Sequence, residues 1–312
     1  TLCIDQVDAD RIILKEKIDE ALLRLEKENL ISRNGNLYFF LTNEEREVSR
    51  EIKSVEISSH AETNLLSDII FEDILKNKSK HRYIPFKRDY AFNRICDEKP
   101  WSKKLENELG LEIISPMHDR YLEYNPGKCN MHSLDSDGIV LIKLDNDQDL
   151  FSEIRTYIQT DKYINTKSDA AASTSLRQIL RDRADENRGR KERLIAKVND
   201  LILNAKYYTL GKALELKVAT TSKSLDDAFN YLIQNTFSKF NYLAQVHDDP
   251  IKEIKQILLS DDIGQEQLVL EFAKEETQDI KEVRTFIDLK TASNKSIVLD
   301  ELVKHFAKRP YG

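Results

Sequence analysis

The stretch Ile12–Thr42 reads IILKEKIDEALLRLEKENLISRNGNLYFFLT. Apolar residues recur at helical spacing as far as Asn29, and two short apolar segments then flank Asn34-Gly35. Asn-Gly between two strands is typical of a tight β-hairpin, because a type I′ turn needs positive φ at both central residues. A helix followed directly by such a hairpin predicts a winged helix, a fold that usually reads DNA or contacts other proteins.

The residues around this hairpin refine the prediction. Thr42 and Glu45 have the spacing of a capping box, in which each side chain accepts a hydrogen bond from the other residue's backbone N–H, so a second helix is expected from Thr42 onward. The first helix carries more acidic than basic side chains, whereas reading DNA requires positive charge that offsets the phosphates. A protein-contact role is therefore at least as well supported as base reading. Arg33, at the tip of the predicted wing, could still contact a DNA backbone.

The composition of the chain indicates folded, helix-rich domains. Its 312 residues suffice for two or three domains, with 40% hydrophobic and 33% charged residues and a net charge of −7. No apolar run reaches the roughly 18 residues of a membrane span, and no signal peptide opens the chain. The 3 cysteines are too few for a disulfide framework and fit a reducing cytoplasm. Because the chain begins with Thr1, we expect a fragment of a longer protein.

Residues 76–104 form a strongly basic block with interleaved aromatic residues. Cations that bind phosphates, together with aromatic faces that stack on bases, are typical of nucleic-acid surfaces. The alternative is a strand whose aromatic side chains point into a core and whose cations are solvated. The cationic candidates for nucleic-acid contact in this block are Lys78, Lys80, Arg82, Lys87 and Arg88. The interleaved aromatic residues are Tyr83, Phe86, Tyr90, Phe92 and Trp101.

A second basic block lies in a long helix predicted over about Ser173–Leu203. Arg177, Arg181 and Arg188 fall on one stripe of this helix and are further candidates for nucleic-acid contact. The alternative is a solvated face with local acidic partners. The middle of the helix, Asp185–Glu192, contains no apolar residue, so we predict that it is solvated and bridges two packed ends.

The fold class predicted from these patterns is α+β and mainly helical, with an N-terminal winged helix, a small mixed α/β domain and then long helices. The boundaries are 1–60 for the winged-helix-like domain, 61–165 for the mixed α/β domain, 166–295 for a helical domain with a short hairpin, and 296–312 for the start of a truncated further domain. Strands are expected at His81–Phe86, Asp89–Cys96, Leu111–Ser115 and Ile139–Leu144, and the short hairpin within Tyr207–Val218. Helices are expected from Thr42 to about His60, then at Glu62–Leu75, Gln148–Gln159, Leu225–Leu243, Pro250–Leu259, Gln265–Leu289 and Ser296–Lys308.

Catalytic and metal-binding patterns are weak. The phosphate-binding loop GxxxxGK[ST] is absent, since neither Gly-Lys pair of the chain is followed by Ser or Thr. Asp145, Asp147 and Asp149 lack the other residues of a calcium loop and are better explained as acidic residues at a helix N-terminus. Cys129 and His132, with His118, fall short of a zinc site, so a surface loop is favoured there. We predict no catalytic, cofactor-binding or metal-binding residue in this chain.

Several long phrases of the chain resemble one protein family. They are RLEKENLISRNGNLYFFLTNEE (Arg24–Glu45), KRDYAFNRICDEKPW (Lys87–Trp101), SEIRTYIQTDKYI (Ser152–Ile164), LRDRADENRGRKERL (Leu180–Leu194), NTFSKFNYL (Asn235–Leu243) and VLDELVKHFAKRPYG (Val298–Gly312). These phrases are similar to the large P-loop ATPase component of bacteriophage-exclusion (BREX) systems, the BrxC family with its relative PglY. The resemblance covers most of residues 12–312.

The resemblance implies an antiviral-defence protein with an AAA-like ATPase module upstream of this region. ATP and Mg²⁺ would then belong to that module, and the partners would be other defence proteins, namely a DNA methyltransferase and a phosphatase-like subunit, and DNA. Our leading hypothesis is a non-catalytic interaction region that couples the upstream ATPase to DNA or to partner proteins. The rival hypothesis is a nucleic-acid-binding module that uses the basic and aromatic block Lys76–Lys104. The direct partner, the oligomeric state and the role of the acidic helix Gln265–Leu289 stay open.

Overall fold

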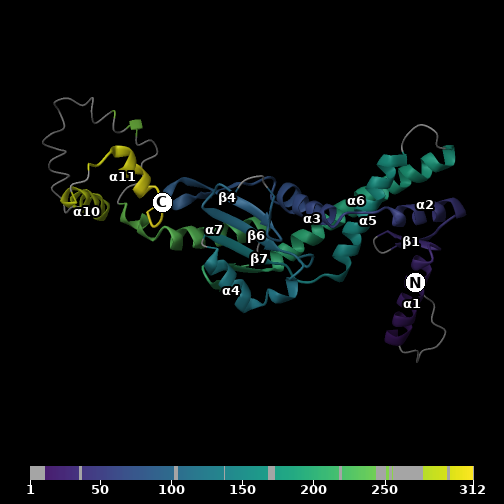
Figure 1. Ribbon diagram of the computed structural model, residues 1–312. Coiled ribbons are helices and arrows are strands. Elements are labelled where there is room, and N and C mark those ends of the chain that lie inside the picture. The colour runs from purple at the N-terminus through teal and green to yellow at the C-terminus, as the bar shows by residue number, and fades with distance from the viewer. Residues whose placement is uncertain are drawn as a thin grey trace. The chain divides into compact units, whose positions relative to one another are not determined.

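The computed structural model describes residues 11–34, 37–101, 105–136, 138–167, 173–217, 220–243, 251–252, 255, 277–293 and 296–311 (Figure 1). The chain divides into two compact units. Unit 1 comprises Thr1–Asn77, Ser115–Asp119 and Leu144–Asn204. Unit 2 comprises Lys78–Ile114, Arg120–Lys143 and Ala205–Gly312.

Unit 1 is helical apart from one hairpin. Its elements are α1 (Arg11–Lys27), β1 (Ile31–Asn34), β2 (Leu37–Phe40), α2 (Asn43–Ser54), α3 (Ser59–Asp68), the π-helix η1 (Ile69–Ile74), α5 (Gln148–Lys167) and α6 (Thr174–Asn204). The two long helices α5 and α6 pack side by side (Figure 1). The core between α2 and these helices contains Val48, Ile52, Tyr163 and Leu180.

The N-terminal part of unit 1 has the predicted local structure. α1 is followed by the antiparallel pair β1–β2, in which Ile31 lies opposite Phe40. The turn at 35–36 lies outside the described residues. The Thr42 side chain accepts from the Glu45 backbone N–H, and the Glu45 side chain accepts from the Thr42 backbone N–H at 2.7 Å, so the capping box is confirmed.

The apolar residues of this part are less buried than expected. No described residue of α1 is buried, and all four described side chains of β2 are exposed, with Phe40 at 86%. The helix and hairpin therefore present apolar side chains that the described part of the chain does not cover.

Unit 2 is built on one mixed sheet whose strands follow the order β3-β4-β6-β7-β8-β9. β4 runs parallel to β6, β6 runs parallel to β7, and the other neighbours are antiparallel, with β5 attached beside β4. The strands are β3 (Lys80–Tyr83), β4 (Arg88–Cys96), β5 (Lys99–Pro100), β6 (Leu109–Ile114), β7 (Ile139–Lys143), β8 (Lys206–Thr209) and β9 (Lys212–Leu214).

Helices α4 (Pro126–Asp135) and α7 (Thr221–Thr236) cover opposite faces of this sheet. Phe92 packs on Phe229 of α7 and lies beside Leu109 in register. Glu112 is hydrogen-bonded to His132 of α4. Because successive side chains of a strand alternate between faces, Leu109 and Glu112 point to different sides of β6. Each face of the central parallel strands is therefore buried under a helix, as parallel sheets require.

The predicted hairpin at 207–218 is confirmed and completes this sheet. Leu210 and Gly211 have φ of 50° and 77°, the pair of positive values that a type I′ turn needs. Thr209 on β8 donates its hydroxyl to the Ile139 carbonyl at 2.7 Å. The hairpin therefore extends the sheet formed by strands far earlier in the chain, a long-range pairing that its own sequence does not reveal.

Several predicted element boundaries are corrected by the structure. α2 ends at Ser54 and not near His60, because Val55 adopts an extended conformation that stops the helix. The predicted strand 81–86 ends at Tyr83 and continues as a 3-10 turn, η2 (Ile84–Phe86), where Pro85 removes a backbone donor. α5 continues beyond Gln159 as far as Lys167.

The C-terminal part contains η4 (Ser238–Tyr242), α10 (Gln278–Ala292) and α11 (Leu299–Phe306). The predicted helix 250–259, and 265–276 of the predicted acidic helix, lie mostly outside the described residues. Lys239 and Tyr311 both bond the Glu282 carboxylate, at 2.9 and 2.7 Å, and so tie η4 and the chain's end to α10. Within the described ranges, no helix is long and apolar enough to cross a membrane.

Candidate functional site

The basic block 76–104 contains the β3–β4 hairpin, and its cations Lys80 and Arg82 lie on the outer face. Lys80 and Arg82 are exposed on β3, where Arg82 forms an ion pair of 3.1 Å with Asp89 on the neighbouring strand. Lys87 is exposed in the turn before β4, and the Arg88 guanidinium lies 5.4 Å from the Tyr90 ring centre. The predicted cations Lys80, Arg82, Lys87 and Arg88 are thus close together and accessible.

The aromatic side chains of the same hairpin lie on the inner face. Tyr83, Tyr90 and Phe92 are 7% exposed or less. Tyr90 packs on Phe237, with ring centres 5.1 Å apart, and burial raises the pKa of its phenol. The structure therefore separates Lys80 and Arg82 from the aromatic rings, as the core alternative predicted, whereas Arg88 lies on the same face as Tyr83 and Tyr90. A phosphate could be bound on the outer face, but these rings are not available for stacking on bases.

Lys78 is paired with α7 in a partly exposed contact and does not lie on the outer face with Lys80 and Arg82. Its ammonium lies 2.5 Å from the carboxylate of Asp226 on α7. The same carboxylate oxygen lies 3.0 Å from His81 Nδ1, and His81 Nε2 lies 2.8 Å from the side-chain oxygen of Asn230. His81 is 3% exposed, so this network fixes β3 onto α7. Lys78 is consequently a structural cation, unlike Lys80 and Arg82.

The second basic block also divides by helix face. Arg177, Arg181 and Arg188 are exposed on α6, and Arg188 forms an ion pair of 3.3 Å with Asp185, as the solvated alternative predicted. Arg183, Asn187 and Arg190 lie on the opposite, buried stripe. The predicted solvation of Asp185–Glu192 is therefore wrong: the middle of α6 packs through polar side chains instead of apolar ones.

The buried stripe is held by specific hydrogen bonds. Arg183 donates to Ser32, Ser49 and Glu186, at 3.2, 3.3 and 2.7 Å. Arg190 donates through Nε to Glu153 and through Nη1 to the Asn187 side-chain oxygen, each at 3.1 Å. Asn187 donates in turn to the Tyr157 carbonyl at 3.1 Å. Apolar periodicity cannot detect this stripe, although its residues have the spacing of a core-facing stripe.

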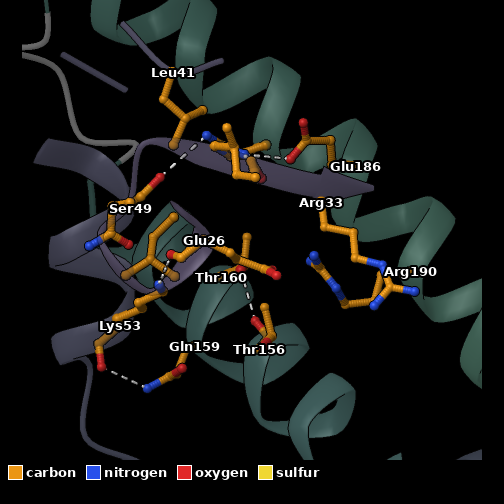
Figure 2. A pocket seen from close by; sticks show the side chains of 15 residues that line it. Glu26, Arg33, Leu41, Ser49, Lys53, Thr156, Gln159, Thr160, Glu186 and Arg190 are labelled. Carbon is orange, nitrogen blue, oxygen red and sulfur yellow. Dashed lines mark hydrogen bonds and ion pairs between the residues drawn. The ribbon is translucent and has the colours of Figure 1, made fainter. Parts of the chain in front are cut away.

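A cavity of about 120 Å³ lies in unit 1 beside these arginines (Figure 2). It is lined by the hairpin strand β1, by α2, and by the facing stripes of α5 and α6. Arg33, the predicted wing-tip cation, lines it together with Arg183 and Arg190. The sequence thus identified one of the three arginines, and the fold supplies the other two from residues about 150 positions away.

The predicted weak metal candidates do not converge. Cys129 and His132 lie on α4 and not in a surface loop, and the Cys129 side chain is fully buried against the Tyr124 carbonyl. Burial raises the pKa of its thiol. His132 bonds Glu112 at 2.9 Å, and this hydrogen bond raises the pKa of the imidazole. Throughout the described ranges, no three His, Cys, Asp or Glu side chains could share a metal ion.

The acidic turn 145–149 has the helix-terminus role predicted for it. Asp147 accepts the backbone N–H groups of Asp149 and Leu150, each at 2.9 Å, at the start of α5. It also forms an ion pair with Lys197 at 2.6 Å. These bonds outweigh burial and lower the pKa of the Asp147 carboxyl.

Two family models match the chain. The model described as "BREX ATP-binding protein BrxC 4th domain with six-stranded beta sheet" matches residues 55–232. The model described as "BREX ATP-binding protein BrxC winged helix-turn-helix domain" matches residues 239–312. The first match includes the whole continuous strand path β3-β4-β6-β7-β8-β9. No solved structure matches the chain.

The name of the family implies ATP, and the residues of the turn from β7 into α5 do not fit it. A triphosphate needs a glycine-rich turn whose backbone N–H groups converge on the phosphates. The turn from β7 into α5, Leu144–Asp147, contains no glycine and carries two aspartates. Asp147 already occupies the N–H groups that open α5. No catalytic step through ATP is therefore assigned to this chain.

The matches also bear on the winged helix. The winged-helix model covers the C-terminal 239–312, which we predicted as the end of the helical domain 166–295 and the start of a truncated domain at 296–312. Neither model covers α1 or the β1–β2 hairpin. The N-terminal winged helix is thus not confirmed, although its helix and hairpin are present. Because the first model alone matches more than half of the residues and the second continues from it, the chain belongs to the BrxC family of BREX ATP-binding proteins.

Proposed function

We propose that this chain is a non-catalytic interaction region of a phage-defence ATPase, which couples an ATPase module of the BrxC protein to DNA or to other BREX proteins. The observation that carries the proposal is the pair of adjacent BrxC domain matches, one of them a winged helix-turn-helix domain. Winged helices usually serve in DNA or protein contacts. The aspartate-containing turn before α5 supports a role without ATP chemistry.

The experiment for this proposal measures partner binding and ATP turnover with the same preparation. The purified chain is titrated against the methyltransferase and the phosphatase-like protein of its own system, and against duplex DNA, by analytical ultracentrifugation. Phosphate release from ATP is measured in parallel. The proposal expects a saturable complex with at least one of these partners and no turnover above a heat-denatured sample. Turnover by the chain, or binding to none of the three partners, would contradict it.

A second candidate function is a nucleic-acid-binding module, which the exposed cations Lys80, Arg82, Lys87 and Arg88 of the β3–β4 hairpin support. Phosphate contacts of this kind make affinity depend steeply on salt. Fluorescence anisotropy with labelled duplex DNA across a salt series tests it, with Lys87→Glu/Arg88→Glu as the variant. Each lost phosphate contact should reduce the salt slope by about one. An unchanged affinity and slope in the variant would exclude this hairpin as the DNA-binding surface.

A further inference from the structure

The arginine-lined cavity of unit 1 has the chemistry of an anion site. Its lining contains the four cations Arg33, Lys53, Arg183 and Arg190 against the two carboxylates of Glu26 and Glu186. Figure 2 shows Arg33 and Arg190 together at one end of the cavity and Lys53 at the other. One carboxylate, Glu186, is already bonded to Arg183 at 2.7 Å. Four cations of the lining thus stand against two of its carboxylates, and Arg190 is also paired with Glu153 beside the lining at 3.1 Å.

The two α6 arginines are held rigidly, with donor groups left over. Arg183 and Arg190 are each 8% exposed, and their hydrogen bonds to Ser32, Ser49 and Glu153 fix the two guanidinium planes. Among the described residues, Arg190 Nη2 and Arg183 Nε take part in no hydrogen bond, and neither atom is fully buried, so a ligand can reach both N–H groups. A buried guanidinium with an unused N–H group favours an acceptor of negative charge.

The surroundings of Arg190 increase this preference. Burial lowers the pKa of its guanidinium, an effect larger than the opposing one of Glu153, so the charged form is under-solvated. An anion in the cavity would replace the missing solvation. Hydroxyl groups of Ser32, Ser49, Thr156 and Thr160 complete the polar lining.

Size and geometry select among anions. A volume of about 120 Å³ is well below the several hundred Å³ that usually enclose a nucleotide or a drug-sized molecule. It suffices for a single tetrahedral oxyanion. Planar guanidinium groups bind phosphate oxygens in pairs, which is why arginine predominates where phosphates are recognised.

We propose that this cavity binds one phosphoryl group, with Arg33, Arg183 and Arg190 as its ligands. This site is separate from the outer face of β3–β4 and requires neither DNA nor ATP hydrolysis, so it goes beyond the proposed function. Arg183 and Arg190 form the fixed floor, and the exposed Arg33 on β1 closes the site from the hairpin. The phosphoryl group can come from free phosphate or from the terminal phosphate of a nucleotide.

Isothermal titration calorimetry of the intact chain with inorganic phosphate tests the proposal, with sodium chloride at equal ionic strength as the blank. AMP and ATP form two further arms that separate a free anion from a nucleotide phosphate. The main variant is Arg33→Gln, since an exposed side chain on a short strand can be changed without emptying the core. Arg181→Gln, on the exposed stripe of α6, is the matched control because it removes the same charge outside the cavity.

The expected result is saturable phosphate binding that Arg33→Gln weakens about tenfold or more, as the loss of one charge-assisted hydrogen bond implies. Arg181→Gln should bind as the unchanged chain does. Arg190→Lys keeps the charge and loses the paired donors, so it should also weaken binding while the circular dichroism spectrum stays the same. No heat beyond the chloride blank, or equal losses in Arg33→Gln and Arg181→Gln, would overturn the proposal.

Discussion

On β3–β4 the cations Lys80 and Arg82 lie outside and the aromatic rings inside, whereas on α6 the arginines of one stripe lie inside. Lys80 and Arg82 face solvent because the alternate positions, His81 and Tyr83, carry rings that pack on α7 and its neighbours. Arg190 faces inward because Glu153 and Asn187 accept hydrogen bonds from its Nε and Nη1. A basic block is therefore a solvent-exposed surface in one unit and part of a packed polar core in the other.

This difference shows what determines whether a charged side chain is buried or exposed. A cation can be buried only where hydrogen-bond acceptors meet it, since an unpaired buried charge is strongly unfavourable. α6 faces such acceptors on β1, α2 and α5, and α7 offers one to Lys78 through Asp226. Lys80 and Arg82 alternate with the inward-facing residues of β3, so their outward direction follows from the strand's pleat.

The largest expected effect comes from the inner face of β3–β4. Phe229 of α7 is 2% exposed and contacts the rings of His81 and Phe92, with centres 5.5 and 4.6 Å away. Phe229→Ala should lower the free energy of unfolding by about 3–5 kcal/mol, because it leaves a cavity under both strands. Urea denaturation measures this change. Lys80→Ala on the outer face serves as the control and should stay within about 0.5 kcal/mol of the unchanged protein. Similar losses in the two variants would contradict the division into faces.

A smaller effect is expected on α6, where two arginines of the same helix differ in burial. Arg190→Ala leaves Glu153 and Asn187 without their partner and should cost about 1–3 kcal/mol of unfolding free energy. Arg188→Ala removes an ion pair whose side chains are 74% and 70% exposed, so the cost should stay within about 0.5 kcal/mol. The comparison is made by urea denaturation of both variants. Equal costs would mean that the buried stripe contributes no more than the solvated one.

The smallest expected effects concern the pH dependence of stability, which should differ between the two units. In unit 1, the backbone N–H of Thr42 lowers the pKa of Glu45, so this contribution to stability is full above the unfolded pKa, about 4.3, and is lost as pH falls through the folded value. In unit 2, the hydrogen bond that His132 donates to the Glu112 carboxylate raises the pKa of His132. That contribution is full below the unfolded pKa, about 6.5, and is lost as pH rises through the folded value.

Single substitutions show which residue causes the loss of stability in acid and which causes the loss above neutral pH. Glu45→Gln should reduce the loss of stability in acid, and His132→Gln should reduce the loss above neutral pH, with each variant leaving the other limb unchanged. Denaturation midpoints across pH provide the measurement. A His132→Gln curve parallel to that of the unchanged protein would show that the His132–Glu112 contact carries no linked proton.

Local signals in the sequence predicted much of the fold. The capping box at Thr42, the hairpin around Gly211 and the strands 89–96 and 139–144 depend on neighbouring residues and were located to within a few positions. What the sequence did not predict depends on distant partners. β8 joins β7 across more than sixty residues, and the polar stripe of α6 is recognisable only once the acceptors on β1 and α5 are placed.

For the candidate sites too, the sequence predicted what depends on neighbouring residues but not what depends on distant partners. The cations of β3–β4 were identified from composition, but only the strand pairing shows that Lys78 turns inward to Asp226 while Lys80 and Arg82 stay outside. Arg33 was identified from its place at the wing, whereas its cavity partners Arg183 and Arg190 come from the far end of unit 1's sequence. The DNA-binding or protein-binding role of these surfaces stays a prediction.

The measurement that tests the account most directly compares two charge reversals in DNA binding. Fluorescence anisotropy across a salt series is recorded for the unchanged chain, for Lys80→Glu/Arg82→Glu on β3, and for Arg181→Glu/Arg188→Glu on α6. The account predicts salt-dependent binding that the β3 reversal weakens strongly and the α6 reversal weakens less. Lys80 and Arg82 are two residues apart on one strand face, whereas Arg181 and Arg188 lie two helical turns apart and Arg188 is paired with Asp185. Binding that is lost in the α6 variant and kept in the β3 variant would contradict it.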